Sequence, residues 1–264
     1  MSLIEDPLVA PPAIEVPLKN APLVRVIAQV RFPAILAIEQ PDFVAPFQET
    51  LRATYPVLRK EQAQGLLIAP AGVASVKPQT AWRFADVDGH WRVSLTPDFL
   101  ALETTNYRSR SEFLTRLRAV VAALGEHVEP KLIDRLGVRF IDRITGAAVD
   151  DITKLVRSEV RGIIGTAAGS HVVHTLSETM FELDDARVVA RWGCLPPETT
   201  IDPGAIEPVP DKSWILDLDM FTAKPVPFVA DQVVKDAERY AERIYTFFRW
   251  AVTDDFLRRY GGKL

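Results

Sequence analysis

Arginines stand at alternate positions in several strand-like segments of the chain. In segments 23–32 and 135–144 the alternation places the arginines on one face, opposite most of the valines and phenylalanines. A guanidinium group offers paired donors to a phosphate or a carboxylate. The pattern therefore predicts a sheet face that binds an anionic group, with these candidate ligand-binding residues: Arg31, Arg92, Arg139 and Arg143.

A sheet face of ion pairs is the alternative interpretation. Opposite charges on neighbouring strands commonly pair, and Glu103, Asp217 and Asp219 stand on strand-like segments. The net charge of −4 favours this alternative. The sequence leaves open whether these arginines are free or paired.

Two of the acids also suggest a metal site. Asp217 and Asp219 lie two residues apart on a strand, so both carboxylates point to one side and could share a divalent cation. Nuclease-like and polymerase-like centres use such carboxylates, usually with a third acid and two metals. The spacing fixes no third acid here, so the pair is a weak candidate and pairing with arginine is favoured.

No residue pattern predicts a catalytic centre. His171 and His174 are three apart in a strand-like segment and face opposite sides, which disfavours a zinc site. Cys194 is the one cysteine, and a lone cysteine is more often a small buried residue than a nucleophile. The nucleophile-elbow, Walker A and dinucleotide glycine patterns are absent. We therefore assign no catalytic residue, expect no cofactor, and favour a non-enzymatic protein.

The elements that would position these residues occur twice. The tripeptide Val-Arg-Phe appears at 30–32 and at 138–140, each time in an apolar strand pattern. Each copy precedes a helix, further strands and a long helix, in the order β-α-β-β-β-α. Helical periodicity places helices over 43–55, 109–124, 150–164 and 231–254, with Ser109 or Ser111 as a cap and Gly125 at a helix end.

This order predicts an α+β fold of two tandem β-α-β-β-β-α repeats, which form curved, mostly antiparallel sheets with the helices on one face. TATA-binding-protein-like and helix-grip-like pseudo-duplications share the order, an analogy of fold that carries no function. We expect an extended, proline-rich arm over 1–22, a first repeat over 23–130 and a second over 131–264, in one pseudo-symmetric unit.

Composition limits the class of protein. The chain has 264 residues, 48% of them hydrophobic and 25% charged, which is usual for a globular protein. It has no apolar run of membrane-spanning length and no secretory-signal pattern, so we expect a cytoplasmic protein without a membrane partner. Proteins that neutralise many DNA phosphates are usually basic, which argues against a nucleic-acid partner but leaves a local basic face open.

Four sequence stretches resemble a sporadically distributed bacterial family of unknown function. They are Leu18-Lys19-Asn20-Ala21-Pro22 running into Gln29-Val30-Arg31-Phe32-Pro33, Trp91-Arg92-Val93-Ser94-Leu95 with Asp98-Phe99, Leu102-Glu103-Thr104-Thr105-Asn106-Tyr107, and Arg135-Leu136-Gly137-Val138-Arg139-Phe140. The resemblance covers most of residues 18–144. It implies a stand-alone bacterial protein and brings no activity, cofactor or catalytic residue with it. Sporadic distribution is typical of mobile or defence-linked genes.

Three hypotheses follow from these observations. The first is a non-enzymatic binding protein whose sheet face or proline-rich arm engages a protein partner, for example a toxin, or an anionic ligand. The second is a metal-dependent enzyme acting on a phosphate-containing or nucleic-acid substrate. The third is a local nucleic-acid binder. Association of identical chains is open in all three.

Overall fold

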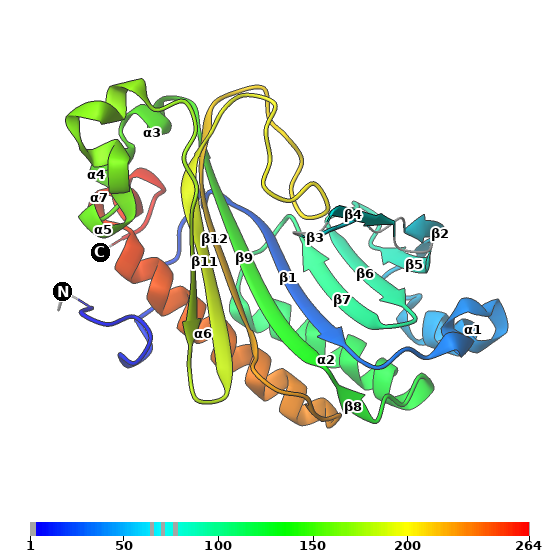
Figure 1. The fold of residues 1–264 in the computed structure, drawn as a ribbon. Helices are drawn as coiled ribbons and strands as arrows, with labels where there is room; N and C mark the ends of the chain where they lie inside the picture. Colours follow the sequence, from blue (N-terminus) through cyan, green and yellow to red (C-terminus); the bar gives the residue numbers. More distant parts are fainter. Residues whose placement is uncertain (1–3, 64–65, 70–71, 76–78, 264) are drawn as a thin grey trace. The chain divides into compact units, whose positions relative to one another are not determined.

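The computed structural model describes residues 4–63, 66–69, 72–75 and 79–263. It has an α+β fold with a large antiparallel sheet, which confirms the predicted α+β class and the predicted antiparallel pairing (Figure 1). The chain forms two compact units: unit 1 comprises residues 1–26, 138–223 and 238–264, and unit 2 comprises residues 27–137 and 224–237. Three elements contribute residues to both units: β1 (Leu23–Arg31), β9 (Arg135–Thr145) and α6 (Ala230–Ala251).

Unit 2 contains strands in the order β1-β7-β6-β5-β2. Its core forms where aromatic rings of the helices meet aromatic rings of the strands. The rings of Phe47 and Phe84 lie 5.6 Å apart, and those of Trp91 and Phe113 lie 5.9 Å apart. The elements are η1 (Leu36–Glu39), α1 (Pro41–Leu51), β2 (Val57–Ala63), β3 (Leu66–Ala69), β4 (Gly72–Ser75), β5 (Gln79–Ala85), β6 (Trp91–Thr96), β7 (Phe99–Thr104), α2 (Arg110–His127), β8 (Leu132–Ile133) and β13 (Val226–Pro227). The apolar pattern of the sequence also predicts a strand over 64–69, of which residues 64 and 65 lie outside the described residues.

Helix α2 shows which local signals in the sequence were informative. Ser109 is its N-cap, because the side chain accepts a hydrogen bond from the backbone N–H of Glu112 at 3.2 Å. Gly125 does not end the helix, which continues to His127. The ring of Phe228 packs against Gly125, and an added Cβ would lie 3.2 Å from Phe228 Cε1. Close packing therefore accounts for this glycine better than a helix end does.

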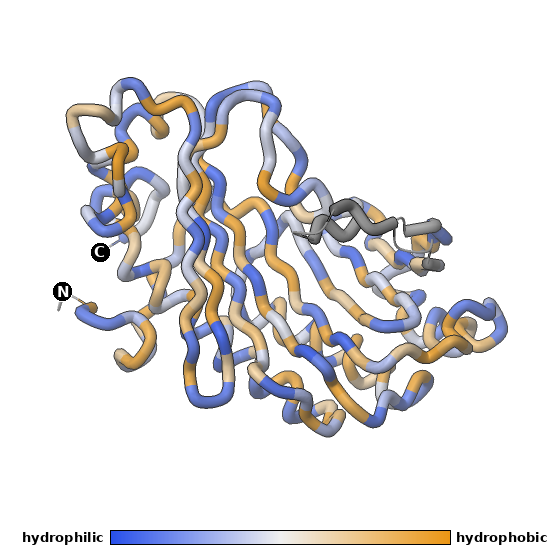
Figure 2. Tube along the Cα trace, in the orientation of Figure 1, coloured by the Kyte–Doolittle hydropathy of each residue, from blue (hydrophilic) through white to orange (hydrophobic). Residues whose placement is uncertain are grey.

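Unit 1 contains strands in the order β10-β11-β12-β9. Helix α6 packs on them, and the rings of Phe181 on β10 and Phe247 on α6 lie 5.8 Å apart. Hydrophobic and hydrophilic residues alternate along these strands (Figure 2), as expected for strands with one buried face. The other elements are α3 (Ala147–Asp150), α4 (Ile152–Leu155), α5 (Ser158–Arg161), η2 (Gly162–Gly165), η3 (Ala167–His171), β10 (Ser177–Glu182), β11 (Ala186–Leu195), β12 (Ser213–Thr222) and α7 (Asp254–Arg259).

The segment after β9 differs from the predicted single helix over 150–164. It forms three short helices, α3 to α5, followed by two 3₁₀ turns. α4 ends where Val156 adopts an extended conformation, and α5 ends at Gly162, whose positive φ of 52° ends regular helix and is tolerated by glycine. The strand expected from His171 starts only at Ser177, because η3 includes His171.

Gly193 on β11 gives a stability prediction. An added Cβ would lie 1.9 Å from the backbone oxygen of Thr175, whose N–H donates to Cys194 O at 3.0 Å. We expect Gly193→Ala to lower the free energy of unfolding by about 1–3 kcal/mol, because the two backbones must separate. Gly204→Ala is the control: its Cβ would meet only Asp202 Oδ1 at 3.4 Å, an ordinary contact. Urea unfolding of both variants checks this, and equal midpoints would contradict it.

Within the described residues, no helix combines the length and apolar character needed to cross a bilayer.

Candidate functional site

The sheet face of unit 1 carries a chain of ion pairs centred on Asp217. Asp217 is fully buried, and its carboxylate accepts three hydrogen bonds. Arg139 Nε donates to Oδ1 at 2.8 Å, Arg139 Nη2 donates to Oδ2 at 2.9 Å, and Arg191 Nη1 donates to Oδ2 at 3.2 Å. Arg191 Nε also pairs with Glu178 on β10. Strand parity brings these side chains together, because Arg191 stands opposite Asp217 in the β11–β12 register and opposite Glu178 in the β10–β11 register.

Asp202 extends the network from the loop between β11 and β12. Arg139 Nη1 donates to Asp202 Oδ2 at 2.6 Å. Burial acts to lower the pKa of Arg139, but the hydrogen bonds and charges of Asp217 and Asp202 outweigh it and hold that pKa above its ordinary value. Burial acts to raise the pKa of Asp202, but the guanidinium of Arg139 outweighs it and holds the pKa of this carboxyl below its ordinary value. Arg139 is therefore a structural cation here, neutralised by two acids.

Asp217, one of the two metal candidates from the sequence, lies among these positive groups. Both oxygens of Asp217 already accept hydrogen bonds from guanidinium groups. The positive charge of these groups would repel a divalent cation at the same carboxylate. Asp219 lies two residues further along β12 and opposite Val189. Among the residues that the structure describes, no group of three His, Cys, Asp or Glu side chains could hold a metal ion. The arrangement favours ion pairing over metal binding at Asp217.

Two of the nominated arginines lie in unit 2, and both pair with acids. Arg92 Nε donates to Glu103, which stands opposite it in the β6–β7 register. Arg31 Nη2 donates to Asp98 Oδ2 at 2.8 Å. The pairing expected from the sequence as the alternative is thus present for Arg92 with Glu103, and for Arg139 with Asp217 in unit 1.

Arg143 differs from the other three nominated arginines. Its side chain is partly exposed, yet Nε and Nη2 are buried and find no hydrogen-bond acceptor among the described residues. Burial lowers the pKa of Arg143, with no acid acting against it. An uncompensated charge with unsatisfied donors is costly, and such groups call for a ligand, water or ion that meets them.

Ser213 adds a second unsatisfied group on the same face of unit 1. Strand alternation places Arg143 with Arg139 and Ser213 with Asp217, each four residues apart. The strands β9 and β12 are neighbours and run in opposite directions (Figure 1), so both positions lie toward the same end of the pair. Ser213 is fully buried, and its hydroxyl has no hydrogen-bond partner among the described residues. We call Arg143 and Ser213 together the Arg143 site.

Asp142 is a buried carboxyl that the sequence pattern did not single out. It is only 7% exposed, and burial raises its pKa to about 7. The alternation in β9 contains the signal, because Asp142 occupies a position between Phe140 and Ile144 on the otherwise apolar face. Cys194, expected to be a small buried residue, is buried, which raises the pKa of its thiol.

No protein-family model matches the chain, and neither the curated proteins nor the solved structures contain a match. The roles of these residues therefore rest on their own chemistry.

Proposed function

We propose that the chain is a binding protein that recognises an anionic group of its partner at the Arg143 site in unit 1. The observation that carries this proposal is the set of unsatisfied donors on Arg143, next to arginines that acids already neutralise. A carboxylate or phosphate would accept from the guanidinium of Arg143 through charge-assisted hydrogen bonds. We propose a protein as the carrier of this group, and the cytoplasm as the compartment.

The two other functions have less support. A metal-dependent enzyme would need Asp217 as a ligand, but its oxygens accept from Arg139 and Arg191. A nucleic-acid binder would need several free cations along a backbone, and the sheet-face arginines 31, 92, 139 and 191 are each paired with an acid. One uncompensated guanidinium suits recognition of a single anionic group.

We also infer that the two halves of the chain are related by duplication, as the predicted repeat implies. The strand order β1-β7-β6-β5 in unit 2 has its counterpart in the order β9-β12-β11-β10 in unit 1. In each set the first strand in sequence lies beside the last, and the chain then continues into a long helix, α2 or α6. This order supports the analogy with TATA-binding-protein-like pseudo-duplication, which stays a proposal.

Anion binding to the full chain tests the proposed function. We expect inorganic phosphate or succinate, titrated calorimetrically, to bind the wild-type chain, and Arg143→Gln to weaken binding by about ten- to a hundredfold. This range corresponds to about 1.5–3 kcal/mol for hydrogen bonds to a charged group. Phosphate and succinate in parallel distinguish the two kinds of anionic group.

Arg187→Gln is the matched control, because Arg187 lies on β11 in the same unit and donates to the exposed Glu182 at 3.0 Å. It should leave anion binding unchanged. Equal binding by wild type and Arg143→Gln would refute the site. Affinity capture from the native source, with wild type and Arg143→Gln as baits, then identifies a protein retained by the wild type alone.

A further inference from the structure

Arginines on the strands of both units use the same edge of the guanidinium to hold an acid. In each case the Nε–H group donates to a carboxylate on the neighbouring strand of the sheet. The pairs are Arg83 with Glu61, Arg92 with Glu103, Arg139 with Asp217, and Arg191 with Glu178. Hydrogen bonds from a guanidinium to a carboxylate are stronger than bonds between neutral groups, and opposite charges on adjacent strands stabilise a sheet. A carboxylate is therefore the acceptor that this protein repeatedly places at the Nε–H group of a strand arginine.

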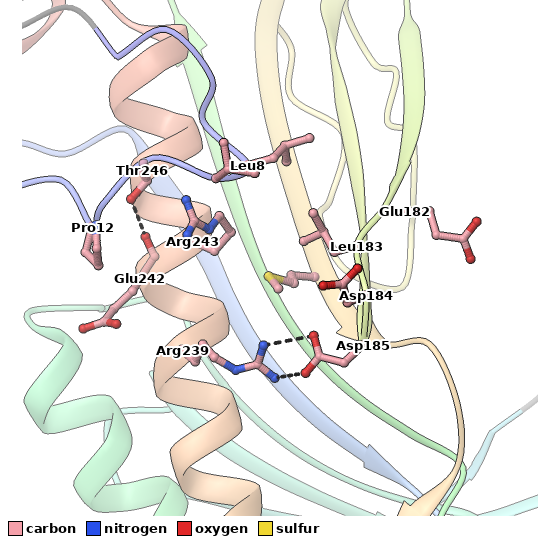
Figure 3. A pocket seen from close by; sticks show the side chains of 12 residues that line it. Leu8, Pro12, Glu182, Leu183, Asp184, Asp185, Arg239, Glu242, Arg243 and Thr246 are labelled. Atoms are coloured by element: carbon pink, nitrogen blue, oxygen red, sulfur yellow. Dashed lines mark hydrogen bonds and ion pairs between the residues drawn. The ribbon is translucent and has the colours of Figure 1, made fainter.

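Arg139 shows the complete geometry of such a contact. Its Nε donates to Asp217 Oδ1 at 2.8 Å and its Nη2 donates to Oδ2 at 2.9 Å, so one edge of the guanidinium holds both carboxylate oxygens. Arg239 also holds Asp185 by two hydrogen bonds, of 3.1 and 2.7 Å, through its two Nη groups (Figure 3). Two-point binding of a carboxylate by arginine thus occurs at two places in unit 1.

Arg143 has no acceptor at the same pair of atoms. Its Nε and Nη2 are buried and without a hydrogen-bond partner among the described residues, and these are the atoms with which Arg139 holds Asp217. The two arginines stand four residues apart on one face of β9. Buried donors that stay unmet cost free energy, and a carboxylate would meet both of them at once.

Strand β12 supplies no acid beside Arg143. Asp217 of this strand pairs with Arg139, and the position four residues before it, toward Arg143, is Ser213. Serine carries a neutral hydroxyl where Asp217 carries a carboxylate. No acid acts on the pKa of Arg143, which burial alone lowers. The negative charge that Arg139 receives from within the chain would therefore reach Arg143 from a ligand.

The charge balance next to Arg143 favours a ligand with a single negative charge. The Asp217 network sets three acids against two arginines: Asp217, Asp202 and Glu178 against Arg139 and Arg191. A carboxylate would neutralise Arg143 and add no further charge. A phosphate monoester carries about −1.5 to −2 charges at pH 7, so its excess charge would face a network that is already negative.

We propose that the anionic group recognised at the Arg143 site is a carboxylate of the protein partner, held by Nε and Nη2 of Arg143 as Asp217 is held by Arg139. This inference rests on the proposed function and narrows its ligand from an anion to a carboxylate. Both nitrogens are covered in the free chain, whereas the side chain as a whole is partly exposed. On binding, the guanidinium turns its covered edge to the ligand and exchanges two unmet donors for two charge-assisted hydrogen bonds.

Acetylated and amidated tripeptides with a variable central residue test the proposal with the full chain. The central residue is glutamate, glutamine or phosphoserine, and the affinity and the NMR signal of the Arg143 Nε–H group are measured. We expect the glutamate peptide to bind and to shift this signal downfield, because the group gains a charged acceptor. The phosphoserine peptide should bind about fivefold more weakly, and the glutamine peptide should not bind.

A fourth peptide distinguishes the two sources of a carboxylate in a protein. It has glutamine at its centre and a free C-terminal carboxyl group, so its binding would indicate recognition of a chain end. Binding of the amidated glutamate peptide alone would indicate recognition of an acidic side chain. Either result supports a carboxylate ligand.

Arg143→Lys separates two-point geometry from charge alone. Lysine keeps the positive charge but lacks the planar pair of donors, so the affinity for the glutamate peptide should fall about tenfold. The same variant identifies the Arg143 signal, which it removes. Arg187→Gln is the control outside the site and should bind as the wild type does. Undiminished binding by Arg143→Lys would overturn the two-point geometry.

Ser213→Asp provides an acid within the chain. We expect it to shift the Arg143 Nε–H signal in the absence of ligand and to lower the affinity for the glutamate peptide about tenfold, since its own carboxylate competes. Ser213→Asn has the same volume as Ser213→Asp without the charge, and should have the smaller effect on both. An unshifted signal in a folded Ser213→Asp chain would count against the proposed geometry. If substitution at this buried position unfolds the chain, the Arg143→Lys comparison decides.

The outcomes separate this inference from the proposed function. Tighter binding of the phosphoserine peptide, lost in Arg143→Gln, would overturn the carboxylate and leave the anion site in place. Absence of binding by all four peptides would overturn both. Equal binding of the amidated glutamine and glutamate peptides would also overturn both, because charge would then play no part in recognition.

Discussion

Asp217→Asn is expected to lower the free energy of unfolding by about 3–5 kcal/mol, the range measured when one partner of a buried ion pair is removed. Asp217 is fully buried and accepts from both Arg139 and Arg191. Asparagine keeps the volume but removes the negative charge, so Arg139 retains only Asp202, and one amide donor now faces guanidinium donors. Urea unfolding followed by tryptophan fluorescence measures the loss.

Asp255→Asn provides the comparison within unit 1. Asp255 pairs with Arg258 on α7 at 2.8 Å, and both side chains are exposed. Exposed pairs contribute at most about 1 kcal/mol, so this variant should unfold close to wild type. If the two variants lost the same stability, Asp217 would be no more than another solvated ion pair.

The central position of Asp217 illustrates what strand parity can and cannot predict. Alternation alone placed Arg139 away from the apolar face of β9, and it put Asp217 among the acids available to the arginines. Which acid pairs with Arg139 could be identified only from the three-dimensional arrangement of the strands, since Arg139 and Asp217 are 78 residues apart in the chain. The pairing of Asp202 with Arg139 could not be predicted from the sequence either, because Asp202 lies in a loop whose path depends on tertiary packing.

Local signals succeeded where the physics is local. The cap by Ser109 depends on a backbone N–H three residues away, so the sequence alone could predict it. To predict the break in the helix after β9, Gly162 would have had to count for more than the helical period of the apolar residues. Docking of the arm on α6 depends on contacts such as that between Ala13 and Thr246, 233 residues apart, which no local pattern encodes.

Asp142 gives the second large expected effect, a stability that falls as pH rises from about 4 to about 7. Burial raises the pKa of Asp142 from an ordinary value of 3.8 to about 7 in the folded chain. Between these values the folded chain holds a proton that the unfolded chain has released, so the slope of unfolding free energy against pH is negative. The stabilisation is complete below about pH 4 and lost above about pH 7.

Asp142→Asn should remove this dependence. A pKa difference of about three units corresponds to about 4 kcal/mol, so the variant should exceed the wild type by up to this amount at pH 8 and match it near pH 4. Urea unfolding at pH 4, 6 and 8 gives the difference curve, in which contributions of other titrating groups cancel. Asp211→Asn, at an exposed position in the same unit, should give a flat difference curve.

A flat difference curve for Asp142→Asn would mean that water or a rearranged neighbour solvates the ionised carboxylate in the folded chain. A curve of the opposite sign would mean that a cation pairs with it. Tyr260 offers no such compensation, because Asp142 acts to raise the pKa of the Tyr260 hydroxyl, as a negative charge does. Among the described residues no ion pair or hydrogen bond meets the Asp142 carboxyl, so ionising it should cost the folded state stability.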